Sequence, residues 1–362
     1  MPVPSETIWN IEPHTLAKHK ILERYLQAWY PILNTYNRRI IYLDGFCGPG
    51  CYSGGEPGSP IIAIDTALTH RSKMVGEVVF VFIDERKDRI ENLRSELARR
   101  KIPADFKVHA QHGRFDEVVG SILDGLDSEH QNLAPTFAFV DPFGFSGVPF
   151  AVLRRLLRNP KCEVFVTFMV DAMNRFLDGP DEEIRAHIAD FFGSSEILEA
   201  SKEAGNRKTY LLNAYKNRLS DEACFVREFE MCNRNDRVIY YLLFATNNAL
   251  GHLKMKEAMW KVDGEGDYKF SDKTNPEQIV LFRQDHSRPL YEDVQKRFTN
   301  SKRQMQEVIT YVCDETPYVV KHLRQALRDA EARGWIQVDQ LKVDGQRRKR
   351  GTFPDDAVIN FQ

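Results

Sequence analysis

The stretch Arg39-Ile-Ile-Tyr-Leu-Asp44-Gly-Phe-Cys-Gly48-Pro-Gly50 joins an apolar run to an acidic residue and a turn rich in glycine. The apolar run is typical of a buried parallel strand. Asp44 follows at the carboxyl end of that strand, which is where open α/β sheets bind their ligands. Gly45, Gly48 and Gly50 allow a tight turn and a close approach of the backbone to a ligand. We therefore predict a nucleotide-type binding site here, with a glycine-rich hairpin turn as the structural alternative.

Further apolar runs alternate with segments of helical periodicity. The expected strands cover residues 40–44, 78–83, 106–110, 136–140 and 163–170, and the helices between them cover 61–68, 86–100, about 115 onward, and 148–157. An amphipathic helix over about 14–29, with Pro31 after its end, precedes the first strand. This alternation predicts an α/β protein with a parallel, doubly wound, Rossmann-like sheet.

The second half of the chain has a different pattern. Residues 171–222 are mainly helical and polar, which indicates an insertion or lid, and the β-rich runs 225–230 and 238–246 are expected as the last two strands. Loop signals near 262–285 mark a boundary, so we predict one domain over 1–275 and another over 285–362. Helices at about 288–298, 302–313 and 318–333, a strand at 335–338 and a basic turn at 344–351 predict a winged helix.

Composition narrows the class of protein. The 362 residues contain no run of 18 apolar residues, and the first residues lack the basic and apolar regions of a signal peptide, so we expect a cytoplasmic protein without membrane spans. The six cysteines lack the spacing of a zinc or iron–sulfur site, so no metal is expected. With a net charge of −2, any nucleic-acid surface must be a local patch.

The strand followed by Asp-x-Phe-x-Gly-x-Gly resembles motif I of class I S-adenosylmethionine (SAM) methyltransferases. A dinucleotide fingerprint fits less well, since Ser53 stands where a third glycine is needed. The resemblance implies that SAM is the cofactor, that the last two strands form a hairpin, and that Asp44, Gly45, Phe46, Gly48 and Gly50 bind SAM. Backbone N–H groups of residues 46–50 would hold its methionine carboxylate. Asp44 would pair with the cofactor's ammonium or fix the loop, and its alternative role is to cap a tight turn.

Two further segments are candidates for the cofactor site. Asp84 or Glu85 follows the second strand and is placed to accept hydrogen bonds from the ribose hydroxyls. The alternative for Asp84 is an N-cap of the next helix. Residues 111–115, with His112 among them, follow the third strand, where the methyltransferase family binds adenine. A plain solvated loop is the alternative there.

Asp141-Pro142-Phe143-Gly144 resembles the Asp/Asn-Pro-Pro-Tyr/Phe motif of amino-methyltransferases that act on adenine or cytosine, although one proline is missing. The resemblance implies that Asp141 and a backbone carbonyl orient an exocyclic amine, while Phe143 stacks on a flipped base. The alternative is a strand-end turn with Phe143 in the core.

Other polar residues are placed to contact a substrate. Asp171 and Asn174 follow the fifth strand and are expected at the pocket edge. Lys18 and His19 on the first helix are candidates for the substrate side, with a solvated helical face as the alternative.

The C-terminal segment carries a cluster of cations that suits phosphate contact. Its members are Lys321, Arg324 and Arg328 on a predicted helix, and Lys342, Arg347, Arg348, Lys349 and Arg350 in the predicted wing. An exposed charged helix and hairpin is the alternative, since Asp329 and Glu331 dilute the patch.

Nearly the whole chain resembles the three-Cys-motif partner proteins. The stretches that carry this resemblance are Trp9-x4-His14-Thr15-x2-Lys18-His19, Leu22-x2-Tyr25-Leu26-x2-Trp29, 43–50, 55–60, 140–144 and Phe244-Ala-Thr with Met255, Met259 and Trp260. It implies a methyltransferase-like protein with a radical-SAM-like partner that carries the three cysteines. The leading hypothesis is thus a SAM-dependent methyltransferase acting on an amino group of a nucleic-acid base. A scaffold for the partner and a small-molecule methyltransferase are the alternatives.

Overall fold

The computed structural model describes residues 4–263, 266–273, 285–339 and 347–362. The chain divides into two compact units, the first comprising Met1–Val262 and Lys269–Asn275 and the second Asp263–Tyr268 and Pro276–Gln362. Lys342 and the first part of the predicted basic turn lie outside the described residues.

The first unit is built on an eight-stranded sheet in the order β3-β2-β1-β4-β5-β7-β6-β8. Its strands are β1 (Arg39–Asp44), β2 (Glu77–Asp84), β3 (Phe106–His112), β4 (Thr136–Val140), β5 (Cys162–Phe168), β6 (Phe225–Cys232), β7 (Val238–Thr246) and β8 (Lys269–Ser271). The strands β1 to β5 are mutually parallel, whereas β7 runs antiparallel to both of its neighbours. A doubly wound sheet that closes on a β6–β7 hairpin is the predicted class I methyltransferase fold, so the prediction of the fold class is confirmed.

Two strand predictions need correction. The strand predicted over 163–170 ends at Phe168, and helix α6 begins at Val170, because a continuous apolar run does not mark where strand gives way to helix. The predicted hairpin is not the end of the sheet, since β8 pairs in parallel with β6. At three residues, β8 is too short to produce a periodic signal.

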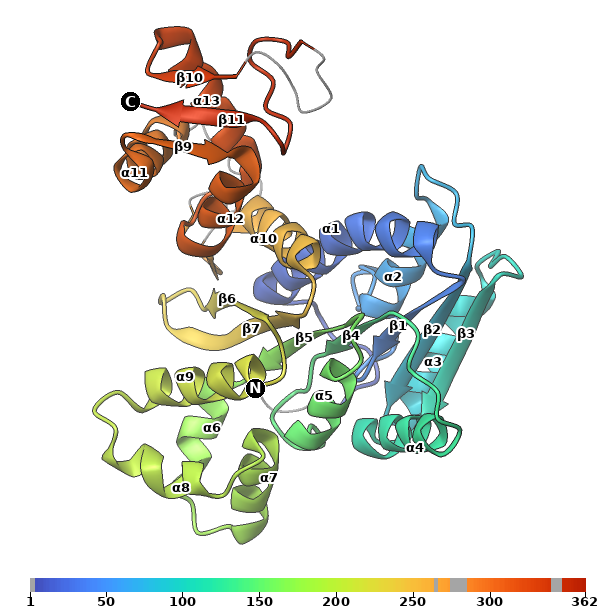
Figure 1. The fold of residues 1–362 in the computed structure, drawn as a ribbon. Helices are drawn as coiled ribbons and strands as arrows, with labels where there is room; N and C mark the ends of the chain where they lie inside the picture. The colour runs from blue at the N-terminus through green and yellow to red at the C-terminus, as the bar shows by residue number, and fades with distance from the viewer. Residues whose placement is uncertain (1–3, 264–265, 274–284, 340–346) are drawn as a thin grey trace. The chain divides into compact units, whose positions relative to one another are not determined.

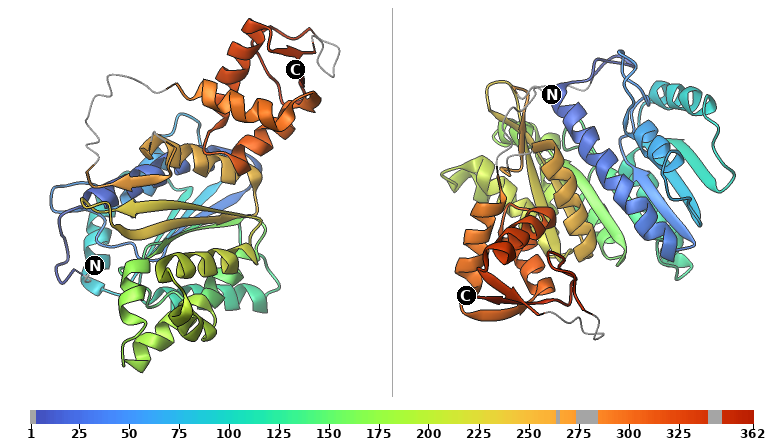
Figure 2. Two further views of the ribbon diagram at one scale, coloured as in Figure 1. Left: turned by 90° about the vertical axis from the view of Figure 1, so that its left-hand side faces the viewer. Right: turned by 90° about the horizontal axis from the view of Figure 1, so that it is seen from above.

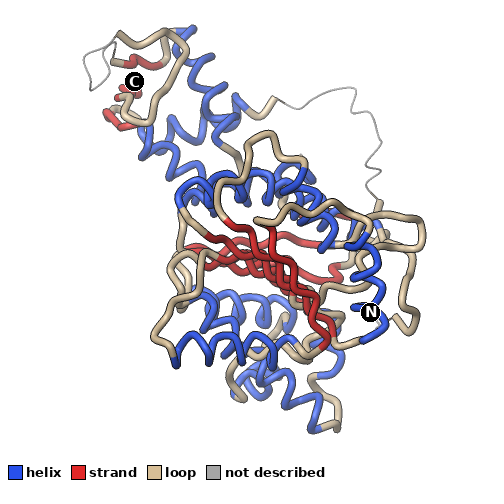
Figure 3. Tube along the Cα trace, turned by 90° about the vertical axis from the view of Figure 1, so that its right-hand side faces the viewer, coloured by secondary structure: helices blue, strands red, loops and turns tan. Residues whose placement is uncertain are grey.

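Helices cover both faces of the sheet, as Figures 1 and 3 show. On one face lie α1 (Pro13–Tyr36), α2 (Ser59–Leu68) and α10 (Ala249–Asp263), which Figure 2 shows from above. Leu93 of α3 (Lys87–Ala98) and Ile61 of α2 both lie against Gly50. The other face is covered by α4 (Phe115–Ser128), α5 (Phe150–Leu157), α6 (Val170–Phe176), α7 (Glu182–Phe192), α8 (Glu196–Ala200) and α9 (Arg207–Ser220), with a short 3₁₀ turn at Ser201–Glu203. The sheet is therefore buried on both faces, which explains the near-continuous apolar runs of its strands.

Helix α1 continues through Pro31 to Tyr36, so the predicted end before Pro31 is wrong. Proline has no N–H, and the carbonyl four residues earlier, that of Gln27, loses its helical partner. The Nε2 atom of His70 lies 3.0 Å from this carbonyl oxygen, while His70 Nδ1 accepts a hydrogen bond from the backbone N–H of Ser72. A side chain from outside the helix thus replaces the missing donor.

Among its described residues, the second unit combines three helices with a three-stranded sheet in the order β10-β11-β9. Its elements are α11 (Ser287–Phe298), β9 (Ser301–Gln304), α12 (Met305–Glu315), α13 (Val320–Arg333), β10 (Ile336–Val338) and β11 (Val358–Phe361). This order is that of a winged helix, as predicted. The helix predicted over 302–313 starts later, because residues 301–304 pair with β11 and Gln304 then forms a capping box with Glu307.

No helix among the described residues has the length and apolar character needed to cross a membrane.

Candidate cofactor and substrate site

The glycine turn after β1 has the backbone conformation that its glycines allow. Gly48 and Gly50 have φ angles of 65° and 88°, in the left-handed region that glycine adopts without a steric penalty. A Cβ atom at Gly45 would collide with the ring of Phe115. The predicted tight turn at the carboxyl end of β1 is therefore present.

The hydrogen bonds of this turn differ from the prediction. The N–H of Cys47 donates to the Ile83 carbonyl at 2.9 Å, and the N–H of Gly48 donates to Asp84 Oδ2 at 3.0 Å. The N–H of Phe46 lies 3.4 Å from Asp44 Oδ1. Because these donors already have partners inside the protein, residues 46–48 do not supply free N–H groups to the carboxylate cradle predicted for 46–50.

Asp44 is fully buried and acts inside the turn. Its carboxylate accepts a hydrogen bond from the N–H of Phe46 and another, at 3.3 Å, from the hydroxyl of Tyr42. Burial raises the pKa of Asp44 from 3.8 to about 7, a nearby charge on Asp141 adds to the rise, and a hydrogen bond from Ser59 opposes it. The contact with Phe46 is that of a turn cap, the alternative role, and pairing of Asp44 with the cofactor's ammonium stays a prediction.

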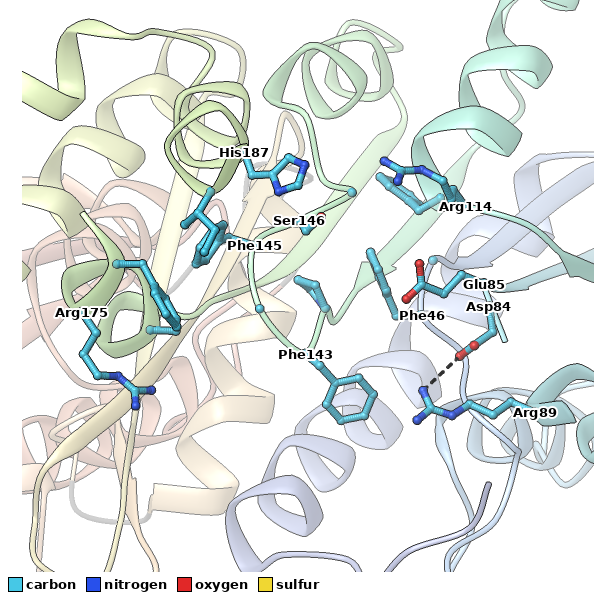
Figure 4. A pocket seen from close by; sticks show the side chains of 18 residues that line it. Phe46, Asp84, Glu85, Arg89, Arg114, Phe143, Phe145, Ser146, Arg175 and His187 are labelled. Atoms are coloured by element: carbon cyan, nitrogen blue, oxygen red, sulfur yellow. Dashed lines mark ion pairs between the residues drawn. The ribbon is translucent and has the colours of Figure 1, made fainter. Parts of the chain in front are cut away.

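A cavity of about 480 Å³, here called the first cavity, lies at the carboxyl ends of β1, β2 and β4 (Figure 4). Gly45 and Phe46 come from the turn after β1, and Phe115 comes from the start of α4. Its remaining lining is Asp84, Glu85, Arg89, Arg114, 142–147, Ala172, Arg175, Phe176, Ile184 and His187. The strand-end residues among them were predicted from the sequence, whereas the lining residues of α6 and α7 were not.

The two acidic residues after β2 differ in availability. Asp84 is only 4% exposed, and its oxygens accept hydrogen bonds from the N–H groups of Gly48 and Arg86. Burial raises its pKa. Glu85 is exposed and lines the first cavity, so it is the better placed of the two predicted ribose ligands.

His112 does not line the first cavity. Its ring Nε2 lies 3.0 Å from the carbonyl oxygen of Glu85, which ties the end of β3 to the end of β2. Within the predicted adenine segment, Arg114 and Phe115 line the cavity, and the guanidinium of Arg114 pairs with Asp116.

A second cavity, of about 440 Å³, shares Pro142 and Phe143 with the first. It is lined by Pro4, Trp9, Asn10, Glu12, Thr15, Lys18, Tyr52, Asp141, Pro142, Phe143, Thr167, Met169 and Tyr240. The Lys18 ammonium forms an ion pair with Asp141 Oδ2, and the Thr167 hydroxyl donates to Asp141 Oδ1 at 2.5 Å. Pro142 and Phe143 therefore form the common wall of the two cavities, and Asp141 beside them lines the second.

Phe143 is part of an aromatic cluster and is neither free nor in the core. Its ring centroid lies 5.5 Å from that of Trp9, edge to face. The guanidinium of Arg89 lies 4.7 Å from the centre of the Trp9 ring and 5.3 Å from that of Phe143. Trp9 and Arg89 were not predicted as site residues, since they contact Phe143 only through the tertiary fold.

The residues predicted for the substrate side separate into two groups. Lys18 and His19 are 5% and 3% exposed, so the alternative of a solvated helical face is wrong for both. His19 packs against Tyr52, and burial lowers its pKa to about 3. Asp171 and Asn174 line neither cavity. Asp171 instead forms ion pairs with Lys208 and Arg237, which lowers its pKa.

In the winged-helix unit, the predicted basic residues also divide. The side chain of Arg348 makes its contacts inside the unit. It forms an ion pair with Glu331, stacks on Phe353 and donates a hydrogen bond to the Thr352 carbonyl. Its side chain is 5% exposed, so it is not available to contact phosphate. The predicted basic residues that remain exposed are Lys321, Arg324, Arg328, Arg347, Lys349 and Arg350.

Comparisons with known proteins agree with this architecture. Residues 269–342 match the model of the GMT-like wHTH domain. The search of curated proteins finds no match. Similar solved structures include a Legionella pneumophila protein assigned to the family DUF519, with 14% identity, coverage of 71% of this chain and 92% of that chain, and a TM-score of 0.40.

Human methyltransferase-like protein 13 in complex with SAH is also similar, with 10% identity, coverage of 74% of this chain and 96% of that chain, and a TM-score of 0.36. A putative methylase from Haemophilus influenzae shows 20% identity, 39% and 69% coverage, and a TM-score of 0.25. Because these identities and TM-scores are low, the fold assignment rests on the strand order of the sheet. The matches do not test the resemblance to three-Cys-motif partner proteins, which stays a prediction.

Proposed function

We propose that this protein is a SAM-dependent methyltransferase that modifies an exocyclic amino group of a nucleic-acid base. The observation that carries the proposal is the pair of cavities that meet at Pro142 and Phe143, beside the β1–β4 switch point of a class I methyltransferase sheet. One cavity would hold the methyl donor and the other the acceptor, so that the reacting atoms meet at the common wall.

The residues of the first cavity fit SAM. Its volume of about 480 Å³ lies within the usual range for small-molecule sites. Glu85 offers an exposed carboxylate for the ribose hydroxyls, and Phe46 and Phe115, with ring centroids 5.7 Å apart, offer apolar surface for adenine. The N–H groups of the glycine turn are bonded within the protein, so another group must bind the methionine carboxylate. Arg89 and Arg114, the cationic lining residues nearest β2 and β3, would do so.

SAM supplies an electrophilic methyl group, and the amine supplies the electron pair that forms the new N–C bond. The S–C bond breaks with its electrons remaining on sulfur, and the nitrogen then loses one proton. In this chain Asp141 would accept a hydrogen bond from the amine and hold its lone pair toward the first cavity. Phe143, Trp9, Tyr52 and Tyr240 provide aromatic surface for a base.

The winged-helix unit supports nucleic acid as the substrate class. Exposed cations lie on α13, at Lys321, Arg324 and Arg328, and near the wing, at Arg347, Lys349 and Arg350. Such a local patch can bind phosphate although the whole chain carries a net charge of −2.

The cofactor half of the proposal is tested by replacing Glu85 with alanine. Since a carboxylate bonded to two ribose hydroxyls makes charge-assisted hydrogen bonds, we expect SAM affinity to fall by about tenfold or more in calorimetry. Glu91→Ala, which removes an exposed carboxylate of α3 outside the first cavity, is the matched control and should bind SAM normally. Absence of SAM binding by the unaltered protein at millimolar concentration would refute the proposal.

A non-catalytic scaffold for a partner protein is the second candidate. It is favoured by one observation, that the N–H groups of Cys47 and Gly48 and the carboxylate of Asp84 are already bonded within the protein. Under this alternative, Asp141→Ala would leave cellular function intact while a complex with the radical-SAM-like partner remains stable. Loss of function in cells that retain normal levels of the variant would exclude it.

A further inference from the structure

The second cavity presents a fixed donor and a fixed acceptor side by side. Lys18 from α1 and Asp141 from the end of β4 form an ion pair, although 123 positions separate them in the sequence. Thr167 from β5 holds the other carboxylate oxygen at 2.5 Å. Three elements thus fix the orientation of one carboxylate within the cavity lining.

Lys18 retains capacity to donate to a ligand. Its ammonium has three N–H groups. Asp141 is its one hydrogen-bond partner among the residues that the structure describes. The Nζ atom also lies 5.3 Å from the centre of the Tyr240 ring, which lines the same cavity. Since the Lys18 side chain is 6% exposed, water replaces the missing partners poorly, and a ligand acceptor would stabilise the charge.

Asp141 retains capacity to accept. An ionised carboxylate has about four lone-pair sites, and Lys18 and Thr167 occupy two of them. The side chain is 21% exposed, in contrast to that of Lys18, so a ligand can reach it. The cavity therefore offers an acceptor directly beside a donor.

Resting on the proposed function, we infer that the substrate base presents an amine next to an unprotonated ring nitrogen, and that Lys18 donates to this nitrogen while Asp141 accepts from the amine. Adenine offers N6 beside N1 or N7, and cytosine offers N4 beside N3. On the Watson–Crick edge of guanine the N2 amine lies beside N1–H, and the ammonium would face a proton there. On the opposite side the N2 amine lies beside the unprotonated N3, but the sugar on N9 is next to N3 and obstructs an ammonium held in a cavity wall. Lys18 is thereby assigned as a specificity-determining residue for adenine or cytosine.

The electron balance of the reaction is unaffected by Lys18. The amine nitrogen forms the N–C bond, the sulfur of SAM keeps the electrons of the broken S–C bond, and the amine proton leaves toward Asp141 or solvent. Lys18 keeps its protons and acts by holding the ring nitrogen, which fixes the amine at the common wall of the two cavities.

The test uses the full-length protein, SAM with a deuterated methyl group, and single-stranded RNA and DNA oligonucleotides that contain all four bases. Mass spectrometry of the digested nucleosides should find the label on the amine of adenine or cytosine. A matched oligonucleotide carries 1-deazaadenine, 7-deazaadenine or 3-deazacytosine at the labelled position. Removal of the correct ring nitrogen should lower kcat/KM by about 10- to 100-fold, since a hydrogen bond to a charged group is lost.

The Lys18→Met variant completes the cycle. Its kcat/KM on the natural base should fall by a similar factor, and its kcat/KM on the deaza base should be little lower still, because the two changes remove the same hydrogen bond. Lys20→Met, an exposed change on the same helix, is the control and should retain the full deaza penalty. The deaza comparison in the unaltered protein needs no variant and stays decisive should Lys18→Met fail to fold.

Three results would overturn the inference: label on guanine, equal rates on natural and deaza bases, or an equal deaza penalty with and without Lys18. Absence of label on every base, with SAM binding intact by calorimetry, would also overturn it while sparing the cofactor half of the proposed function. Absence of SAM binding would overturn the proposed function together with this inference.

Discussion

Asp44 ends β1 with a fully buried side chain, and burial raises its pKa from 3.8 to about 7. A carboxyl group with a raised pKa in the folded state stabilises that state when protonated. Its contribution is fully present below about pH 4, and it is lost as the pH rises through about 7. One pKa unit corresponds to about 1.36 kcal/mol, so the change amounts to a few kcal/mol at most.

We therefore predict that Asp44→Asn becomes more stable relative to the unaltered protein as the pH rises from 4 to 8. Thermal unfolding of both proteins across this range measures the difference. Asp105→Asn, which removes an exposed carboxylate, controls for the loss of one negative charge. Parallel stability curves for Asp44→Asn and the unaltered protein would contradict the prediction.

The sequence correctly predicted that several acidic residues lie at the ends of strands. Asp44, Asp84 and Asp141 follow β-rich runs, and a parallel sheet brings such positions to one edge. The sequence did not show which carboxylates would form hydrogen bonds within the protein and so be unavailable to a ligand. Asp84 is bonded to two backbone N–H groups, whereas Glu85 beside it lines the first cavity. This difference between the two neighbouring residues depends on the three-dimensional path of the glycine turn, whose N–H at Gly48 bonds Asp84.

Helix α1 owes its length to a contact that no local pattern reveals. Proline at position 31 favours a helix end, and His70, 43 positions from Gln27, supplies the hydrogen-bonding group that permits continuation. The prediction failed because tertiary structure overrode a local signal.

His70→Ala should lower the free energy of unfolding by about 1 kcal/mol, because it leaves the Gln27 carbonyl without its partner. The same change should cost less in a Pro31→Ala background, where a backbone N–H returns to the helix. Urea unfolding of the four proteins in this cycle measures the coupling. Equal costs in both backgrounds would show that His70 does not compensate for Pro31.

The wing is a second element in which sequence reasoning was partly right. Five cations near its tip predicted a phosphate surface, but the fold uses Arg348 to pair with Glu331 and pack on Phe353. A basic run does not reveal which of its members turns inward.

Arg348→Ala should destabilise the second unit by about 3 kcal/mol, because it removes the ion-pair partner of the nearly buried Glu331 and leaves that carboxylate only the N–H of Gly351 among the described residues. Replacing Arg347, Lys349 and Arg350 together should leave stability nearly unchanged. In that variant the slope of log affinity against log salt should become shallower by ~0.9 for each lost contact to duplex DNA, or ~0.7 on single strands. Thermal unfolding and salt titrations separate the two effects. An unchanged slope would mean that the wing is a solvated hairpin.

For the whole molecule, sequence periodicity was enough to predict a doubly wound sheet and a winged helix. The hairpin was expected from the resemblance to methyltransferases, and β8 follows it in the sheet. The apolar runs of β1, β2 and β4 are buried on both faces, and this burial produces the signal. The composite site was less predictable. Trp9 reaches Phe143, and Lys18 reaches Asp141, only because α1 and the segment before it pack beside the carboxyl ends of the strands. Contacts so distant in sequence leave no periodic trace.

Under the proposed function, the two cavities bring SAM and the amine of a nucleic-acid base together for methyl transfer. This is tested by mass spectrometry of nucleosides from total tRNA, rRNA and DNA of cells with and without the gene. Cells that carry only the Asp141→Ala protein extend the comparison to the second cavity. We predict that one N-methylated base is lost on deletion, returns with the unaltered gene, and stays absent with Asp141→Ala. Identical nucleoside profiles in all of these cells would contradict the account.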